Sequence, residues 1–251
     1  MLHHPTLDKL NQLKLTGMRQ ALQEQTAIPE IAAIPFEERL GLLVDRELTE
    51  RGNRRLQIRL RAAKLKQNTA LEDTDFKSPR GLDRSLILKL ADCDWVATHM
   101  NVLITGPTGV GKTWLACALA HKACREGYSA LYARIPRLLQ ELDMGRADGR
   151  YAKVMRHLSK TEVLVLDDWG LATLTDQHRR DLLEILDDRY NLRATLITSQ
   201  LPVPHWHEAV GDPTLADAIL DRVVHNAYKI NLTGNSMRKQ RGKLTAENPA
   251  T

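Results

Sequence analysis

Apolar residues in the first third of the chain recur at close to a 3.6-residue period, which predicts amphipathic helices. Before Pro29 this pattern comprises Leu7, Leu10, Leu13, Met18 and Leu22. After Pro29 and Pro35 it predicts a long helix over residues 36–67, either continuous or broken at Gly52. The apolar stripe of that helix is expected to comprise Leu40, Leu43, Val44 and Leu48. Residues 1–68 are therefore expected to form a small, all-helical N-terminal domain.

The pattern changes after residue 68. Residues 69–81 are mostly polar and contain Ser78-Pro79, as expected of a linker. Residues 82–90 predict a short helix, and beyond them short apolar runs alternate with helical segments, which is typical of a parallel α/β sheet. The expected strands are 102–105, 130–133, 163–166, 195–198 and 228–232, and the expected helices begin near Lys112, Pro136, Thr175 and Pro213. Residues 82–251 are thus expected to form an α/β domain around five parallel strands.

The composition limits the class of protein. A chain of 251 residues with 43 % hydrophobic residues can bury a core, so a disordered chain is excluded. Aromatic residues make up only 4 %, which disfavours a single-strand binder built on stacked bases. Cys93, Cys117 and Cys124 lack C-x-x-C spacing and indicate reduced, buried thiols. With no apolar leader and no run of about 18 apolar residues, a cytoplasmic protein without a membrane partner is expected.

A phosphate-binding motif stands between the first expected strand and the helix that follows it. The residues matching G-x-x-x-x-G-K-[ST] are Gly106, Pro107, Thr108, Gly109, Val110, Gly111, Lys112 and Thr113. Glycines let backbone N–H groups turn inward around phosphates, and the helix N-terminus adds partial positive charge. Lys112 is expected on the β/γ oxygens and Thr113 on Mg²⁺. The motif predicts a site for ATP and Mg²⁺; the alternative is a chance glycine-rich turn.

Acidic and polar residues end two further expected strands. Asp167 and Asp168 follow the apolar run 163–166, which favours Asp167 beside Mg²⁺ and Asp168 near the γ-phosphate, where it could deprotonate the attacking water. The alternative is an ordinary acidic turn. The strand over 195–198 ends in Thr198, Ser199 and Gln200, any of which could contact the γ-phosphate.

Basic residues are concentrated in the expected N-terminal helix. Arg51, Arg55 and Arg59 share one helix face because they are spaced four residues apart. Lys and Arg greatly outnumber acidic residues from Arg46 to Lys66, although the whole chain carries only +5. The candidates for phosphate-backbone contact there are Arg51, Arg54, Arg55, Arg59 and Arg61. A solvated helix face is the alternative.

Taken in order, these motifs resemble the AAA+ ATPases, in particular the helicase-loader branch that contains DnaC. The segments LDDWG, TLITSQLPV and WHEAVGDPTLADAILDRVVHNAYKINLTGNSMRK are most similar to the IstB-type transposition helper ATPases of bacterial insertion sequences. The resemblance implies a P-loop AAA+ core with a parallel five-stranded sheet. It places Arg222 as an arginine finger that reaches a neighbour's γ-phosphate; the alternative is a helix-surface arginine paired with Asp217 or Asp221. Asp168 stands where most AAA+ proteins have Glu, which suggests slow or assembly-dependent hydrolysis.

The same resemblance implies where DNA and a C-terminal lid would lie. In initiator-type AAA+ proteins an added helix before the acidic strand lines the axis of the assembly, which suggests that Arg137, Arg146, Arg150 and Lys153 face DNA. Because few residues follow Gly234, the helical lid is expected to be absent or vestigial. Arg238 is then either a replacement for the lid's sensor arginine or part of a basic tail.

The implied function is an ATP-dependent regulator of insertion-sequence transposition. It would self-assemble on duplex DNA, largely without regard to sequence, and recruit or activate the cognate transposase, in a bacterial cytoplasm and near the nucleoid. The alternative is a DnaC-like loader of a replicative helicase. A small-molecule P-loop kinase is a third possibility, which the paired acids and Arg222 disfavour.

Overall fold

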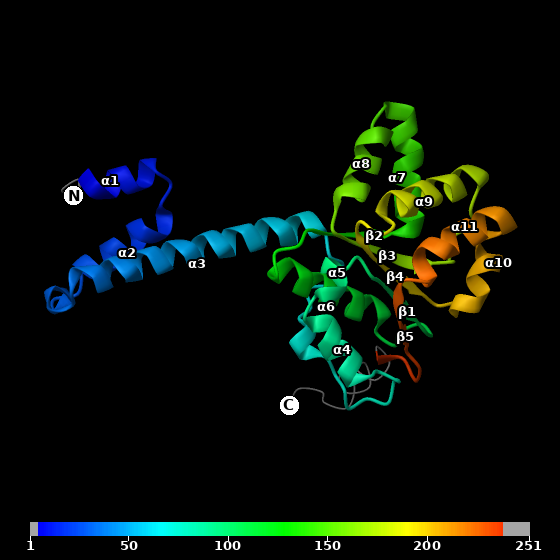
Figure 1. The fold of residues 1–251 in the computed structure, drawn as a ribbon, viewed down its shortest axis with the longest axis horizontal. Coiled ribbons are helices and arrows are strands. Elements are labelled where there is room, and N and C mark those ends of the chain that lie inside the picture. The colour runs from blue at the N-terminus through cyan, green and yellow to red at the C-terminus, as the bar shows by residue number, and fades with distance from the viewer. Residues whose placement is uncertain (1–4, 238–251) are drawn as a thin grey trace, which may run out of the picture. The chain divides into compact units, whose positions relative to one another are not determined.

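The structure, a computed structural model, describes residues 5–237. The chain divides into two compact units, Met1–Ile58 and Arg59–Thr251, and each is described here by itself (Figure 1). The chain passes from the first unit to the second within one helix.

The first unit is helical, as the apolar periodicity predicts. Its elements are α1 (Pro5–Gln12), α2 (Thr16–Thr26), a 3₁₀ turn η1 (Ile31–Ala33) and α3 (Phe36–Ala63). Lys14, with a left-handed φ of 58°, separates α1 from α2. The long helix α3 runs unbroken through Gly52 and ends at Ala63, four residues before its expected end.

A buried carboxylate joins α2 to α3. Glu47 is only 5 % exposed, and it accepts hydrogen bonds from the backbone N–H groups of Gly17 (2.7 Å) and Met18 (3.1 Å). These donors belong to the first turn of α2, which has no cap of its own because Leu15 offers no side-chain oxygen. A Cβ atom on Gly17 would lie 2.7 Å from the Glu47 Cα. The close approach of α2 to α3 at this point therefore requires glycine.

The apolar stripe expected along α3 is largely exposed. Leu40, Val44 and Leu48 are 39 %, 42 % and 63 % exposed. Leu43, the fourth member of the expected stripe, is partly buried, so most of the stripe is open to solvent. The physical reason is that α3 meets α2 through Glu47 and the close approach at Gly17, so a polar position lies at the contact.

A five-stranded parallel sheet forms the centre of the second unit, as the strand pattern predicts. The strands are β1 (Asn101–Thr105), β2 (Ala130–Arg134), β3 (Val163–Trp169), β4 (Ala194–Ser199) and β5 (Ala227–Asn231). They lie in the order β2-β3-β4-β1-β5, and every pair is parallel. The carboxyl ends of all five strands therefore lie along the same end of the sheet, its carboxyl edge; the amino ends of the strands form the opposite edge.

Helices cover the sheet on both faces (Figure 1). On one face α6 (Lys112–Arg125) packs against β1, β2, β3 and β4, with α4 (Arg84–Ala91) beside it. The other helices are α5 (Asp94–Ala97), α7 (Ile135–Asp148), α8 (Tyr151–Lys160), α9 (Asp176–Arg189), α10 (Trp206–Val210) and α11 (Pro213–Val224), with 3₁₀ turns η2 (Leu71–Asp73) and η3 (Val203–His205). The opposite face is covered by α7, α9 and α11, which share a core with Leu103, Leu164 and Ile197. Within residues 5–237 no helix is both long and apolar enough to cross a bilayer.

The polar segment 69–81, expected to be a linker, is a folded part of the second unit. Thr69, Leu71, Thr74 and Arg80 are all buried. Thr74 donates its hydroxyl to the Leu71 carbonyl at 2.5 Å, and the Arg80 carbonyl accepts from the Thr233 N–H at 2.9 Å. The polar side chains bond to nearby backbone here, which is why a polar composition alone suggested a free linker.

Candidate nucleotide-binding site

The phosphate-binding loop joins β1 to α6 at the carboxyl edge of the sheet. Gly106 has φ +143°, and a Cβ atom there would lie 2.1 Å from the Leu232 carbonyl oxygen. Gly111, with φ +102°, is the N-cap of α6. Glycine is needed at both positions because a side chain would be strained or would clash. The loop curves around Lys112, whose Nζ donates to the carbonyls of Gly106 and Pro107, each at 2.7 Å.

Asp167 is the centre of a buried network of hydroxyl groups. Its side chain is 1 % exposed, and the Thr113 hydroxyl donates to its two carboxylate oxygens at 3.0 and 3.2 Å. The hydroxyls of Thr198 and Tyr132 also donate to it. Burial and then the hydrogen bond to Asp167 raise the pKa of Tyr132, so Tyr132 stays a donor.

The donor set fits Mg²⁺. Hydroxyl and carboxylate oxygens are the hard ligands that Mg²⁺ prefers, and Mg²⁺ typically takes only one or two protein ligands beside waters and phosphates. Thr113 and Asp167 offer one of each. Across the part of the chain that the structure describes, no group of three or more His, Cys, Asp or Glu could form an all-protein metal cage.

A bulge in β3 turns two consecutive acids toward this edge. Side chains normally alternate between the faces of a sheet, but the register of β3 on β4 shifts between Leu166 and Trp169. Asp168 adopts a left-handed φ of 65° within the bulge, a conformation that costs about 1–2 kcal/mol outside glycine and is frequent at functional sites. Arg134 donates its Nε–H to the Asp168 carboxylate.

The three polar residues that end β4 have different partners. Thr198 bonds to Asp167, and its hydroxyl oxygen also accepts from the Asp168 N–H at 3.4 Å. The Gln200 side chain accepts from the Thr108 hydroxyl at 2.7 Å and so reaches the phosphate-binding loop. Ser199 instead donates to the Trp169 carbonyl at 2.8 Å. The structure therefore brings Thr198 and Gln200 to the site and turns Ser199 away.

A pocket of about 520 Å³ opens above the loop, within the range of small-molecule sites of about 300–1,000 Å³. Lys112, Thr113 and Asp168 line one side, and Gln67, Arg80 and Trp114 line another. The described chain ends at this pocket, because the Met237 N–H donates to the Gly109 carbonyl at 3.0 Å. Arg238, the predicted sensor candidate, and the residues after it lie outside the described residues, so the expectation of an absent or vestigial lid stays a prediction.

Four residues that the sequence analysis did not assign contact the site. Tyr132 and Arg134 come from the end of β2, where Arg134 pairs in register with Asp167. Lys66 follows α3 and places its Nζ 3.7 Å from the Asp167 carboxylate. Arg80, 6 % exposed, donates to the carbonyls of Val110 (3.3 Å) and Asp75 (2.9 Å), and burial lowers its pKa. The sequence does show a basic residue, Arg134, directly after the expected strand over residues 130–133. It does not show which strand lies next to that one in the sheet, so the contact between Arg134 and the acids could not be predicted.

Arg222 lies at the opposite edge of the sheet from the phosphate-binding loop. Its carbonyl accepts a hydrogen bond from the Asn101 side chain at 3.1 Å, and Asn101 begins β1, whereas the loop leaves the other end of that strand. Five residues of strand span about 13 Å between those ends. The Arg222 guanidinium donates to Asp187 at 2.9 Å. Arg222 is therefore not part of its own subunit's phosphate site.

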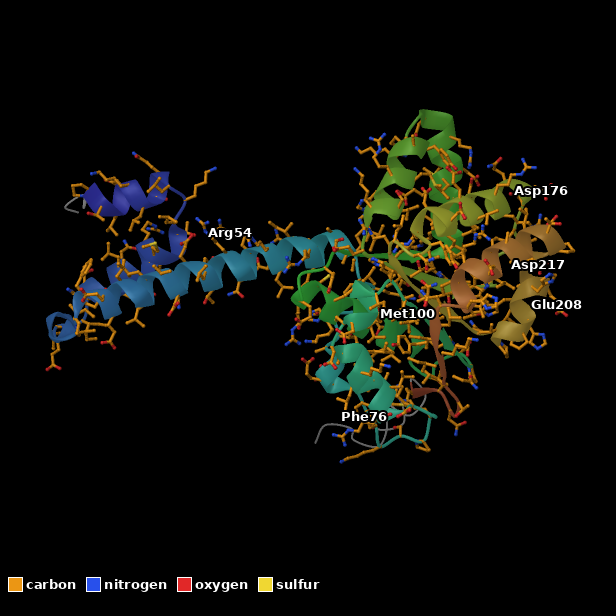
Figure 2. All side chains as sticks on the ribbon, in the orientation of Figure 1. Arg54, Phe76, Met100, Asp176, Glu208 and Asp217 are labelled. Carbon is orange, nitrogen blue, oxygen red and sulfur yellow. The ribbon has the colours of Figure 1, made fainter. Side chains whose placement is uncertain are left out.

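The arginines predicted to bind DNA from the long helix have varied surroundings (Figure 2). Arg51 is paired with Glu47 at 2.7 Å, and Arg54 donates to the Thr16 hydroxyl at 3.0 Å. Arg59 donates to the Cys124 carbonyl at 2.9 Å. Arg55 and Arg61 are exposed.

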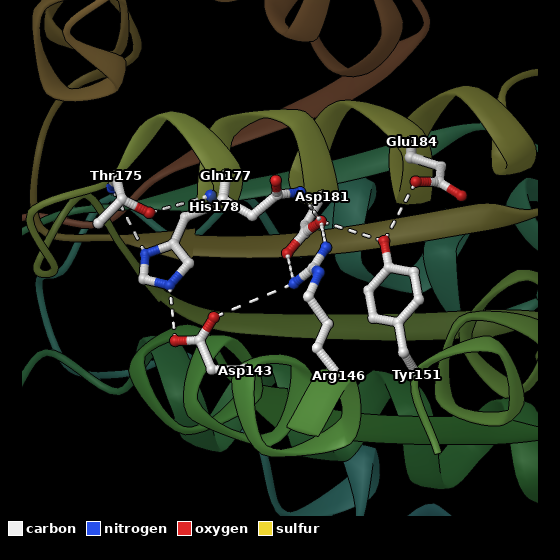
Figure 3. A network of polar contacts seen from close by, with 8 residues as sticks. All are labelled: Asp143, Arg146, Tyr151, Thr175, Gln177, His178, Asp181 and Glu184. Atoms are coloured by element: carbon white, nitrogen blue, oxygen red, sulfur yellow. Dashed lines mark hydrogen bonds and ion pairs between the residues drawn. The ribbon is translucent and has the colours of Figure 1, made fainter. Parts of the chain in front are cut away.

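All four residues of the second predicted group of basic residues are exposed, but their partners differ. Arg146 forms a bidentate ion pair with the fully buried Asp181, and its Nη1 lies 2.8 Å from one carboxylate oxygen (Figure 3). The Arg146 guanidinium also lies 4.0 Å from the centre of the Tyr151 ring. Arg150 pairs with Asp148. Arg137, Arg150 and Lys153 line a second cavity, whereas much of the charge of Arg146 is compensated inside the unit.

Comparison with known proteins agrees with this site. The family model of the IstB-like ATP binding proteins matches residues 8–245. The insertion sequence ATP-binding protein y4pL of Sinorhizobium fredii is 56 % identical over 95 % of this chain and 98 % of its own length. The ATP-binding protein of insertion sequence IS1162 from Pseudomonas fluorescens is 53 % identical over 80 % of this chain and 88 % of its own length.

Solved structures show the same fold. The crystal structure of DnaI is 26 % identical with a TM-score of 0.58, covering 66 % of this chain and 92 % of that one. The DnaC helicase loader is 23 % identical with a TM-score of 0.56, covering 68 % and 99 %. The second unit thus has the P-loop AAA+ fold, and the chain belongs to the family of IstB-like ATP-binding proteins of insertion sequences.

Proposed function

We propose that this chain is an AAA+ ATPase that assembles with copies of itself on duplex DNA and recruits or activates the transposase of its insertion sequence. The observation that carries the proposal is the placement of a complete phosphate site at one edge of the sheet and of Arg222 at the other. A subunit built in this way offers a nucleotide site on one side and an arginine for a neighbour's site on the other.

The chemistry follows from the residues around Asp167. Lys112 and the loop amides hold the phosphates, and Thr113 and Asp167 hold Mg²⁺. When bound, Mg²⁺ supplies neutralisation of the β/γ oxygens. Asp168 orients the attacking water and accepts its proton. Thr198 fixes both acids, since its hydroxyl contacts the Asp167 carboxylate and the Asp168 N–H.

Assembly couples to hydrolysis through Arg222. A guanidinium delivered by a neighbour stabilises the charge of phosphoryl transfer. Arg222 is held by Asp187 and, at 3.5 Å, by Asp221, both exposed acids. An exposed ion pair of this kind is worth about 0.2–1 kcal/mol, so a triphosphate can readily displace Asp187. Hydrolysis is then slow in isolated subunits and faster in the assembly.

Two observations support nucleic-acid binding: the exposed basic side chains of this chain, and the names of its relatives. The exposed Arg55 and Arg61 and the open Arg137 and Lys153 suit contact with a phosphate backbone without reading base edges. The relatives' names place them in insertion sequences, which supports a transposase partner and action beside the bacterial nucleoid, in the cytoplasm. Affinity for DNA is expected to fall steeply as salt rises.

A helicase loader is the second candidate, favoured by the structural likeness to the DnaC helicase loader. Asp168→Asn provides the test, because it preserves the shape of the site while removing the base. The variant is expected to bind ATP, to lose about 100-fold or more of turnover and to stay assembled on DNA. Lys112→Ala, which is expected to lose nucleotide binding, is the matched control.

Capture by the trapped Asp168→Asn assembly separates the candidates. The proposal predicts that it retains the cognate transposase and not the replicative helicase, and that the Lys112→Ala protein retains neither. Retention of the helicase alone would instead identify a loader. Turnover that needs an added small-molecule acceptor and does not rise with protein concentration would identify a kinase.

A further inference from the structure

Three arginines line a narrow depression at the edge formed by the amino ends of the strands. The depression lies there because Asn101 begins β1 and Arg193 directly precedes β4. Arg189, Arg193 and Arg222 contribute to its wall, together with His99 and uncharged side chains. Among the described residues that line it, none is acidic. The proposed function uses Arg222 alone, so two arginines beside it have no part in that function.

Arg189 is a buried cation held only by uncharged oxygens. It is 1 % exposed, its Nη1 donates to the carbonyls of Leu158 and Thr161, each at 2.6 Å, and its Nε donates to the Thr195 hydroxyl at 3.0 Å. Burial and then the charge of Arg193 lower the pKa of Arg189 to about 9, so it is still charged at neutral pH. Its role is to fix the start of β4, and its charge makes this edge of the sheet more positive.

Arg193 differs from Arg189 because its side chain is partly exposed. Its Nη1 donates to the Leu192 carbonyl at 2.9 Å, whereas its buried Nε has no hydrogen-bond partner. Within residues 5–237 it forms no ion pair with a carboxylate. A guanidinium has five N–H donors, so most of the binding capacity of Arg193 is left for a ligand.

The backbone holds Arg193 and Arg222 on one platform. Asn101, 6 % exposed, donates its side-chain N–H to the Arg222 carbonyl at 3.1 Å and accepts the Thr195 N–H at 3.0 Å. The Arg193 N–H in turn donates to the Arg189 carbonyl at 2.9 Å. The main chain at both arginines is therefore fixed to the ends of β1 and β4. Only their side chains need to move to reach a shared ligand, which reduces the cost of positioning them.

We propose that Arg193 binds, beside Arg222, the γ-phosphate in the nucleotide site of a neighbouring subunit. Charge spreads over three oxygens of that phosphate during transfer, and each planar guanidinium can donate two parallel hydrogen bonds to such oxygens. A depression lined by arginines and by no acid suits an anion with more than one charge. The inference rests on the proposed assembly and adds a second catalytic residue to the site that two subunits share.

Two single variants with equal loss of charge provide the first test. Arg193→Ala removes the proposed contact, and its side chain bonds only to the adjacent Leu192 carbonyl, so the fold is expected to persist. Arg180→Ala, the control, removes an exposed arginine of α9 that does not line the depression. Light scattering gives the protein concentration needed for assembly on duplex DNA with Mg²⁺ and a non-hydrolysable ATP analogue. A turnover assay with saturating ATP and duplex gives the rate.

The expected result is that Arg193→Ala needs about tenfold or more protein to assemble, and turns over ATP about tenfold or more slowly, because it loses hydrogen bonds between charged groups. Arg180→Ala should match the wild type in both measurements. Equal behaviour of the two variants would overturn the inference.

Mixing tests whether Arg193 acts on the neighbour. Arg193→Ala keeps its phosphate site and Lys112→Ala keeps both arginines, so turnover should recover when the two proteins are combined. A mixture no faster than its components would place the effect inside one subunit and overturn the inference. A double variant separates direct contact from support of Arg222. Adding Arg193→Ala to Arg222→Ala should raise the concentration for assembly further; no further rise would show that Arg193 only positions Arg222, which also overturns the inference.

A final arm distinguishes the γ-phosphate from a phosphate of the DNA backbone. Fluorescence anisotropy without nucleotide gives the affinity of each variant for the duplex, and Arg193→Ala should bind as tightly as Arg180→Ala. Weaker binding of Arg193→Ala would assign the arginine to DNA and overturn the inference. Failure of the proposed function is distinguishable, since it appears as a wild type that neither assembles nor turns over ATP. Failure of this inference appears as an active wild type that Arg193→Ala equals.

Discussion

Arg134 at the end of β2 donates a hydrogen bond to Asp168 in the bulge of β3. The end of β2 carries no part of the phosphate-binding loop. Through this pair it nevertheless contacts the acid proposed as the catalytic base. Arg134 neutralises that carboxylate and occupies the oxygen that would accept a proton from water.

Arg134→Ala is accordingly expected to raise ATP turnover measured without DNA. The rise should be no more than about fivefold, because the pair is partly exposed and such pairs are worth about 0.2–1 kcal/mol. A variant slower than wild type both with and without DNA would show that Arg134 instead holds Asp168 in its active position.

Complementation between two inactive proteins tests the position of Arg222. Arg222→Ala retains its phosphate site, and Lys112→Ala retains its arginine, so each is expected to turn over ATP poorly alone. Mixed subunits place an intact site beside an intact arginine, and turnover should recover to a fraction of the wild-type rate. An Arg222→Ala protein with normal turnover would contradict an intersubunit role.

The main effect of replacing Arg146 is expected to be on the stability of the fold, and not on DNA binding. Asp181 is fully buried, and Arg146 is its cationic partner, with Tyr151 and Gln177 as further donors (Figure 3). The Arg146 side chain is itself 30 % exposed, so the cost is that of leaving a buried acceptor short of one partner, and Arg146→Ala should lower the free energy of unfolding by about 1–3 kcal/mol in a denaturant titration. Arg150→Ala, which breaks the exposed pair with Asp148, should cost less than about 1 kcal/mol. A fully stable Arg146→Ala protein with weakened DNA binding would support the original prediction for this residue.

The contact between α2 and α3 is expected to depend on pH. Burial by itself would raise the pKa of Glu47, but hydrogen bonds from Arg51, Met18 and Gly17 outweigh it, and the pKa is lowered from 4.5. A carboxyl group with a lowered pKa in the folded state stabilises that state above its unfolded pKa, and the contribution is lost as the pH falls through the folded value. The protection factors of the Gly17 and Met18 amides in hydrogen exchange, which remove the intrinsic pH dependence of exchange, should therefore fall below about pH 4. Exchange that is equally slow in wild type and Glu47→Gln across this range would contradict the assignment.

The parts of the site that were predictable are those encoded by local sequence. The loop from Gly106 to Thr113 lies between the strand and the helix that adjoin it in sequence, and Asp167 and Asp168 directly follow a buried apolar run. Each of these motifs can therefore be recognised within one continuous segment of the chain. Tyr132 and Arg134 join the site only through the pairing of β2 with β3, which a single sequence does not reveal. Lys66 and Arg80 depend on the path of a polar segment that folds onto α6 and the loop.

The exposed stripe of α3 has a different cause. Periodicity identifies which residues share a helix face, but not which face meets a neighbour. In the first unit the choice is made by Gly17, whose missing side chain admits the backbone of α3 at Glu47. Leu48, the next residue, is consequently exposed.

Light scattering of the full chain with duplex DNA tests the central claim, that nucleotide bound between copies of the chain controls assembly. Mass should be measured with ADP, with ATP and with a non-hydrolysable analogue, for the wild type and for Arg222→Ala. The account predicts assemblies of many subunits with the analogue, their loss with ADP and their weakening in Arg222→Ala. A wild-type protein that stays monomeric with saturating analogue and DNA would contradict it.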